Sequence, residues 1–134
     1  MVSAYYLDSS VALRALLGHS ASAAAWMDEA SADDANTLIA SRILRTELTR
    51  VLRRESLPVS LRDEVLDVIA VVPLTDSVLA AAEAIGPHVK TLDAIHLASA
   101  IASGLDVTIV THDAGMAAAA QIIGYPVLDP VEAG

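Results

Sequence analysis

Four acidic residues in this sequence occupy positions from which their carboxylates could act together: Asp8, Glu47, Asp93 and Asp113. Asp8 ends a short apolar segment, Asp113 comes three residues after a β-branched run, and Asp93 opens an alanine-rich segment. Clusters made only of oxygen ligands suit Mg²⁺ or Mn²⁺. These ions polarise a phosphoryl oxygen, lower the pKa of bound water and bind both the attacking and the leaving oxygen. The chemistry to expect from such a cluster is hydrolysis of a phosphodiester bond.

Each of the three aspartates also has an ordinary structural explanation. An aspartate directly before a helix is a favoured N-cap, which stabilises the helix by ~1 kcal/mol. This explanation weakens when the three are considered together, because two or three of them would crowd one edge of a sheet. Like charges at close range raise one another's pKa and destabilise the site unless a cation is present.

Glu47 is distinguished by its position on a helix predicted for residues 42–54. The apolar stripe of this helix comprises Ile43, Leu44, Leu48, Val51 and Leu52. Glu47 is flanked by apolar residues one turn away in each direction, and a carboxylate on such a buried side needs a partner. Two partners are open: a salt bridge to Arg50 or Arg54, or a cation for which Glu47 is the fourth ligand at the sheet edge.

No other motif points to a different chemistry. The sequence lacks the glycine-rich phosphate loops of nucleotide-binding proteins, the serine elbow of hydrolases and the paired histidines of zinc peptidases. The four histidines are scattered. His96 lies among apolar residues and is expected to be structural. His112, next to Asp113, is expected in a surface loop, with contact to a substrate as the alternative.

The elements that must position these residues alternate between short apolar strands and helices. Strands are expected at residues 3–8, 37–40, 70–74, 107–110 and 127–128. Helices are expected at residues 9–17, 20–30, 42–54, 60–68, 77–85, 93–103 and 114–123. Pro73 places the third strand at an edge of the sheet. Ser60 and Asp76 are the expected N-caps of the fourth and fifth helices.

This alternation predicts an α/β fold. Strands separated by helices pair in parallel through right-handed crossovers, and short apolar strands belong to a sheet covered on both faces. The prediction is a three-layer α/β/α sandwich around a central, mainly parallel sheet of four to five strands, with residues 1–134 as a single domain. Ligands of such sheets bind beyond the carboxyl ends of the strands, where Asp8 and Asp113 are expected.

Composition narrows the setting of the protein. Of its 134 residues, 54% are hydrophobic, so intrinsic disorder is not expected. The absence of cysteine excludes disulfides and thiolate metal sites. No apolar run approaches the ~20 residues of a membrane span, and the N-terminus lacks the basic start of a signal peptide. A cytoplasmic protein without membrane contact is expected.

The charge distribution is uneven. The net charge of −9 argues against tight nonspecific binding of nucleic acid, which relies on basic residues. Six of the eight basic residues nevertheless fall in one short stretch: Arg42, Arg45, Arg50, Arg53, Arg54 and Arg62. Arginine matches phosphate with its planar fork. The alternative is a solvated helix face with pairs between residues four apart.

Four segments of the sequence resemble the acidic motifs of a known family. They are Tyr-Leu-Asp-Ser-Ser-Val-Ala-Leu, Thr-Glu-Leu-Thr-Arg-Val-Leu-Arg-Arg, Thr-Leu-Asp-Ala-Ile-His-Leu-Ala-Ser-Ala and Val-Thr-His-Asp. In these motifs, and in size and order, nearly the whole chain resembles the PIN-domain ribonucleases, in particular the VapC toxins of bacterial toxin–antitoxin pairs. The third motif is the most specific of the four.

The resemblance implies a site and a set of partners. The acidic quartet of the family falls on Asp8, Glu47, Asp93 and Asp113. Its small hydroxyl positions fall on Ser9 and Thr111, which would orient ligands or waters. The resemblance also implies a Mg²⁺-dependent endoribonuclease that cuts RNA, a homodimer, and inhibition by a cognate VapB antitoxin whose tail fills the site. Trp26 would be either an anchor for that partner or a core residue.

Two other functions are open. A phospho-receiver domain shares the size and the alternating pattern, but it needs paired acids after the first strand and a lysine near the last. Here Asp8 is followed by two serines, and the only lysine is Lys90. The other function is a PIN fold retained only to bind a partner, against which the four intact carboxylates argue. An assay of RNA cleavage with Mg²⁺ or Mn²⁺ against EDTA would separate the three.

Overall fold

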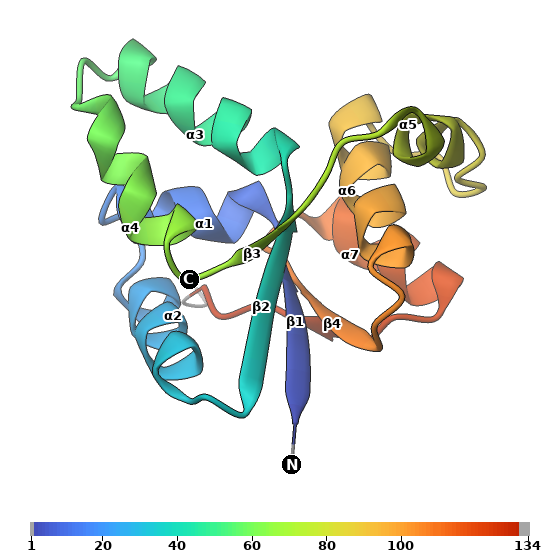
Figure 1. The fold of residues 1–134 in the computed structure, drawn as a ribbon, viewed down its shortest axis with the longest axis horizontal. Coiled ribbons are helices and arrows are strands. Elements are labelled where there is room, and N and C mark those ends of the chain that lie inside the picture. The colour runs from blue at the N-terminus through green and yellow to red at the C-terminus, as the bar shows by residue number, and fades with distance from the viewer. Residues whose placement is uncertain (1, 132–134) are drawn as a thin grey trace.

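A parallel sheet of five short strands forms the centre of the structure, a computed structural model that describes residues 2–131 (Figure 1). The strands are β1 (Ser3–Leu7), β2 (Asn36–Ser41), β3 (Ala70–Val72), β4 (Val107–Val110) and β5 (Val127–Leu128). They lie in the order β3-β2-β1-β4-β5, and every neighbouring pair is parallel. The expected parallel sheet, with the strand that precedes Pro73 at its edge, is confirmed.

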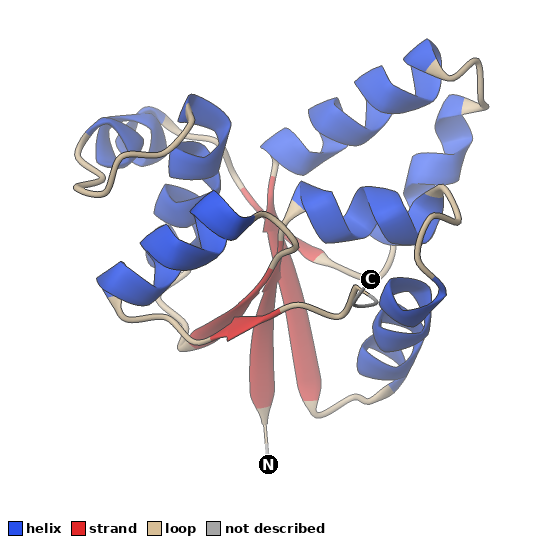
Figure 2. Ribbon diagram, turned by 180° about the vertical axis from the view of Figure 1, so that it is seen from behind, coloured by secondary structure: helices blue, strands red, loops and turns tan. Residues whose placement is uncertain are grey.

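Helices cover both faces of this sheet. They are α1 (Ser9–Leu16), α2 (Ala21–Ala32), α3 (Ile43–Arg54), α4 (Asp63–Leu66), α5 (Asp76–Glu83), α6 (Thr91–Ala102) and α7 (Ala114–Ile123), with a 3₁₀ turn (Val59–Arg62) before α4. Figure 1 shows α1 to α4 on one side and α5 to α7 on the other, and the view from behind in Figure 2 agrees. The predicted three-layer α/β/α sandwich is confirmed.

The strands are short and apolar because each contributes side chains to two cores. Successive side chains of a strand point to opposite faces. In β1, Tyr6 packs in the core beneath α6 and α7, whereas Leu7 packs in the core beneath α1 to α4. Both side chains are fully buried. In β4 the neighbours Ile109 and Val110 divide between the two cores in the same way.

The strand order also fixes where a ligand can bind. From β1 the chain moves outward to β2 and β3, and it then returns to the other side of β1 to form β4 and β5. The order therefore reverses between β1 and β4, and open α/β sheets bind ligands beyond the carboxyl ends of the strands at such a point. Receiver domains have the order 2-1-3-4-5 instead. The phospho-receiver alternative is therefore wrong.

Helices α2 and α3 begin one residue later than predicted, and three further helix starts differ in their cap or their position. The helix expected at 60–68 with Ser60 as its cap is a 3₁₀ turn from Val59 followed by the short helix α4. Thr75, and not Asp76, caps α5, because its side chain accepts a hydrogen bond from the Val78 amide. Helix α6 begins at Thr91, two residues before the predicted start. Among the described residues, no helix is both long and apolar enough to cross a membrane.

Candidate active site

Asp8 lies at the reversal point, directly after β1. Its backbone amide donates to the Val110 carbonyl of β4, and its side chain is almost completely buried. Asp8 occupies the N-cap position of α1, but its side chain makes no capping hydrogen bond. Its Oδ2 instead accepts hydrogen bonds from Ser10 Oγ at 2.7 Å and from Thr111 Oγ1 at 2.8 Å. The carboxylate is thus held by two hydroxyls from neighbouring elements.

The second oxygen of Asp8 has no such partner. Within residues 2–131, Asp8 Oδ1 is buried and accepts no hydrogen bond. The His96 ring lies nearby, with 3.7 Å between Nε2 and Oδ1, which is too long for a hydrogen bond. An unsatisfied buried acceptor costs roughly 1–3 kcal/mol, and more when it is charged. Asp8 therefore carries an uncompensated lone-pair site at the sheet edge.

Glu47 reaches the same edge from α3. Ser9 Oγ donates to its Oε2 at 3.0 Å, and its Oε1 lies 2.7 Å from His96 Nε2. The side chain is 17% exposed. The salt bridge to Arg50 or Arg54, one of the two partners that the sequence allowed for Glu47, is not formed in the part of the chain described. Arg54 pairs with Glu55 instead. Glu47 is therefore directed to the site.

His96 connects Glu47 to the interior of the fold. Its ring is 1% exposed, and its Nδ1 lies 2.7 Å from the hydroxyl of Tyr6, which also accepts a hydrogen bond from the Ser41 amide. An ionised Glu47 only accepts, so His96 Nε2 carries a proton. The expectation that His96 is structural is correct as far as burial goes. It omits the contact with Glu47.

The carboxylates around His96 change its pKa. Burial alone favours the neutral ring and lowers the pKa. The hydrogen bond that His96 donates to Glu47 and the negative charges of Asp8, Glu47 and Asp93 act in the opposite direction, and the net pKa of His96 is raised. Burial, and then the negative charges of Asp8 and Glu47, raise the pKa of Tyr6 well above its usual range, so its hydroxyl keeps its proton.

Asp93 and Asp113 line one hollow of about 480 Å³ together with Lys90 and Gly115. Asp113 is the N-cap of α7, because its Oδ1 accepts a hydrogen bond from the Met116 amide at 3.0 Å. Asp93 is no cap: Lys90 holds the N-cap position of α6, and Asp93 lies in the first turn. The N-cap explanation is therefore correct for Asp113 and wrong for Asp93.

Asp93 is the carboxylate whose charge the site tolerates least. Partial burial, then the negative charges of Asp113 and Asp8, raise its pKa to about 6 from an ordinary value of 3.8. Lys90 and His96 offset only part of this effect. Among the described residues, no hydrogen-bond donor contacts its carboxylate. The structure therefore brings Asp93 into electrostatic contact with Asp8 and Asp113.

The carboxylate oxygens at this site are ligands that fit a hard divalent cation, although they do not yet surround a common point. As the side chains stand in residues 2–131, no three acidic or imidazole groups are close enough together to enclose a metal ion. The buried Asp8 Oδ1 and the Asp93 carboxylate nevertheless accept no hydrogen bond from a described residue. Both are oxygen ligands of the kind that Mg²⁺ and Mn²⁺ prefer. These two residues could hold the ion, with Glu47 and Asp113 beside them.

Ser10 is a site residue that the sequence reasoning missed. Its hydroxyl donates to Asp8 Oδ2, lies 3.2 Å from Thr111 Oγ1 and accepts a hydrogen bond from the His112 amide. The available signal was its position two residues after Asp8, in the first turn of the helix. The His112 side chain is exposed and contacts Asp129, as expected for a surface loop. Ser10 thus ties the loop after β4 to the start of α1.

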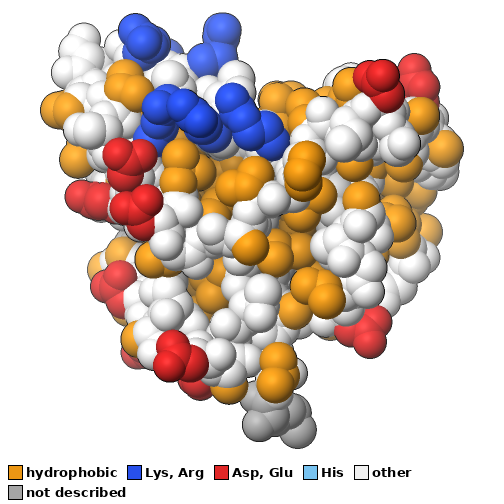
Figure 3. Space-filling model, in the orientation of Figure 1, with side chains coloured by type: hydrophobic (Ala, Val, Ile, Leu, Met, Phe, Trp, Pro, Cys, Tyr) orange, Lys and Arg blue, Asp and Glu red, His pale blue; other side chains and the backbone are white. Residues whose placement is uncertain are grey.

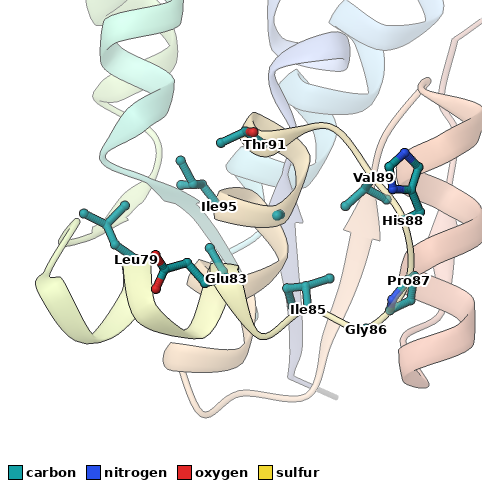
Figure 4. Close-up of a pocket in the computed structure, with 11 residues that line it drawn as sticks. Leu79, Glu83, Ile85, Gly86, Pro87, His88, Val89, Thr91 and Ile95 are labelled. Atoms are coloured by element: carbon teal, nitrogen blue, oxygen red, sulfur yellow. The ribbon is translucent and has the colours of Figure 1, made fainter.

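A second hollow lies beside this site. A cavity of about 500 Å³ opens between α5, α6 and the connecting residues 84–90 (Figure 4). Leu79, Ile85 and Ile95 give it an apolar wall. It contains none of the four acidic residues, although Val89 and Thr91 line both hollows. The acidic hollow, and not this one, holds the groups that could do chemistry.

Comparison with known proteins fits this geometry. Residues 5–122 match the family model described as PIN domain. The chain belongs to the PIN-domain family. This PIN domain is similar to Ribonuclease VapC47 of Mycobacterium tuberculosis (strain CDC 1551 / Oshkosh), with 32% identity over 133 residues that cover 93% of this chain and 96% of the relative. The resemblance to VapC proteins, stated from the motifs, is confirmed.

Solved structures share the fold of this PIN domain. VapBC2 from Rickettsia felis, bound to a DNA fragment from their promoter, matches with a TM-score of 0.71 and 17% identity, over 94% of this chain and 98% of that chain. A toxin–antitoxin complex from Klebsiella pneumoniae matches with a TM-score of 0.72 and 17% identity, over 96% and 99%. At such identities the likeness concerns the fold alone.

Proposed function

We propose that this PIN domain is a metal-dependent endoribonuclease, the toxin of a toxin–antitoxin pair acting in the cytoplasm. The observation that carries the proposal is that two acidic groups near the reversal point of the sheet, the Oδ1 atom of Asp8 and the carboxylate of Asp93, accept no hydrogen bond within the described chain. Without a cation these charges destabilise one another, and with one they form an oxygen-ligand site. The name of the relative Ribonuclease VapC47 supports RNA as the substrate.

The side chains around the site have separable tasks in this proposal. When Asp8 and Asp93 hold Mg²⁺ or Mn²⁺, the chemistry supplied is activation of water and neutralisation of charge on the phosphoryl oxygen. Ser10 and Thr111 fix the Asp8 carboxylate through Oδ2 and leave Oδ1 available. Ser9 and His96 orient the two oxygens of Glu47. These contacts hold the carboxylate oxygens of Asp8 and Glu47 in place before RNA binds.

The proposed partners are a second copy of the chain and a VapB-type antitoxin. The similar structures are VapBC2 from R. felis, bound to promoter DNA, and a toxin–antitoxin complex from K. pneumoniae. An arginine of the antitoxin could bridge two carboxylates in the acidic hollow, where it would compete with the metal ion. Trp26 of α2 is half-buried and its ring packs edge-on against Tyr5 at 5.3 Å, which favours the core role over the anchor role.

RNA cleavage by the purified protein tests the proposal. We expect a single-stranded or structured RNA to be cut with Mg²⁺ or Mn²⁺ and to stay intact with EDTA. Asp93→Asn should be inactive. Asp67→Asn removes an exposed negative charge directly after α4, outside the four acidic site residues, and should cut normally. Light scattering should report a dimer. Cleavage that continues in EDTA, or that survives Asp93→Asn, would reject the metal site as the place of reaction.

A further inference from the structure

The outer face of α3 carries a groove lined with arginines. Its volume is about 250 Å³, and it lies between α3 and the 3₁₀ turn that precedes α4. We call it the arginine groove and define it by Arg42, Arg45, Arg50, Arg53 and Arg62. Thr46 and Thr49 complete its lining. Figure 3 shows the basic side chains of this face gathered over α3, with acidic side chains directly below them at the left.

The positive charges of the arginine groove are not neutralised by the protein. In residues 2–131 the only ion pair of an arginine is that between Arg54 and Glu55, and neither residue lines the groove. The predicted alternative, a solvated helix face with pairs between residues four apart, agrees with the exposure of this face, but in the described part of the chain only Arg42 has such a pair, with Thr46, and none of the five arginines forms an ion pair. No acidic side chain contributes to the lining.

Threonine hydroxyls hold two of these guanidinium groups in place. Arg62 donates to Thr49 Oγ1 at 2.7 Å, and Arg42 donates to Thr46 Oγ1 at 3.3 Å. The side chains of Arg45 and Arg53 make no hydrogen bond within the described chain, and both are exposed. Their donors are free for a ligand, and guanidinium forks match phosphate oxygens two at a time.

The groove is unusual for a chain with a net charge of −9, because it gathers five of the eight basic residues. Concentrated positive charge on an otherwise acidic protein attracts a polyanion to one place. From Arg42 to Arg53 the helix rises roughly 16 Å, enough to follow several phosphates of one strand.

The position of the groove connects it to the active site. Glu47 lies on the same helix and reaches Ser9 and His96, while the groove residues Thr46 and Arg50 lie one and three positions away from it. We call the sheet edge with Asp8, Glu47, Asp93 and Asp113 the acidic edge. A polyanion bound along the groove would therefore run beside the acidic edge. A second copy of the chain facing it with the same groove would bring like charges together, so nucleic acid is the better fit.

We infer that the arginine groove binds the phosphate backbone of the RNA substrate and holds the strand against the acidic edge. This inference rests on the proposed ribonuclease function. The groove binds without regard to base sequence, because guanidinium groups on phosphates carry no sequence information. The carboxylates cut the strand, and the arginines supply the affinity that the net charge of the protein would otherwise oppose.

The test measures binding separately from cleavage. Fluorescence anisotropy follows a labelled single-stranded RNA titrated with protein in EDTA, at several salt concentrations. Arg45→Gln and Arg53→Gln are the test variants, because their side chains hold no other part of the fold. Each should weaken binding by about 3–10-fold, and together they should lower the salt slope by roughly 0.7 per lost phosphate contact. Arg54→Gln removes the same charge from the same helix outside the groove and should change binding less than twofold.

Four outcomes decide the matter. Weakened binding in the groove variants, with a melting temperature unchanged and partial recovery in Arg45→Lys, supports the inference. Binding equal to wild type, or equal to that of Arg54→Gln, overturns it even if RNA is cut, and the proposed function then stands alone. If RNA binds in a way that depends on the groove but is never cut, the RNA-binding role of the groove is supported and the proposed ribonuclease function is rejected. A polyglutamate peptide that binds the groove when RNA does not would overturn the inference in favour of an acidic protein partner.

Discussion

Asp93 is a residue whose negative charge is costly to the metal-free fold. Its pKa in the folded protein is raised to about 6 from 3.8, so its ionised form is disfavoured by folding. A raised pKa in an acid makes the folded state bind protons more readily than the unfolded state. For the metal-free protein, stability should therefore fall as the pH rises from about 4 to above 6.

Asp93→Asn should remove this cost. In EDTA at pH 8 the variant should be more stable than wild type by about 1 kcal/mol, a modest figure because Asp93 is only half-buried and solvent screens its charge. That corresponds to a melting temperature higher by roughly 3–5 °C. The difference should shrink as the pH falls towards 5, where wild-type Asp93 takes up its proton. A variant that melts lower than wild type at every pH would show that Asp93 stabilises α6 instead.

His96 should give the metal-free protein a second pH dependence. Its folded pKa is raised above 6.5, so its proton stabilises the folded state below that pH. This contribution is fully present below about 6.5 and is lost as the pH rises through the folded pKa. In urea denaturation the stability of wild type should fall over this range, while that of His96→Gln should stay nearly flat apart from other groups. Equal slopes for the two proteins would remove the coupling of His96 to Glu47.

The sequence identified some of these residues and not others, for a physical reason. The four acidic residues follow strands (Asp8, Asp113), lie in the first turn of a helix (Asp93) or lie in a helix stripe (Glu47), which are local patterns that the chain displays by itself. The partners of His96 are Glu47 and Tyr6, which lie 49 and 90 positions away. A single histidine among apolar residues carries no sign of such distant contacts. Ser10 was missed for the same reason, since its importance comes from Thr111 and the loop after it.

At the scale of elements, the start of α5 offers a direct comparison of two neighbouring residues. Thr75 accepts a hydrogen bond from the Val78 amide, whereas Asp76 lies inside the first turn. Thr75→Ala should therefore lower the free energy of unfolding by about 1 kcal/mol. Asp76→Asn should cost only a few tenths, through its interaction with the helix dipole. Denaturant titration of both variants measures this, and a larger loss for Asp76→Asn would restore it as the cap.

Most elements were predictable because their boundaries are marked in the sequence. The strand Val107–Val110 and the helix Ala114–Ile123 have their predicted bounds, and Gly124 ends the helix with a positive φ of 111°. The segment from Val59 to Leu66 was harder. It offers several residues that can start a helix, and packing against α3 selects a 3₁₀ turn before α4. Local preferences do not choose among such close alternatives.

At the scale of the whole molecule, the pattern of strands and helices predicted parallel pairing and three layers, but it did not specify the strand order. The order places β1 and β4 side by side, and this contact brings Asp8 to Thr111 across 103 positions of sequence. The acidic edge is therefore a property of the assembled sheet. That residues 1–134 form a single domain stays a prediction.

The central claim is that this edge binds a divalent cation, and calorimetric titration of the protein with Mn²⁺ tests it most directly. Wild type should show a saturable binding process that is lost in Asp8→Asn and weakened in Thr111→Val, since Thr111 fixes the Asp8 carboxylate. Asp67→Asn, at an exposed position, should bind as wild type does. Retention of the same binding process in Asp8→Asn, or its absence from wild type, would contradict the account.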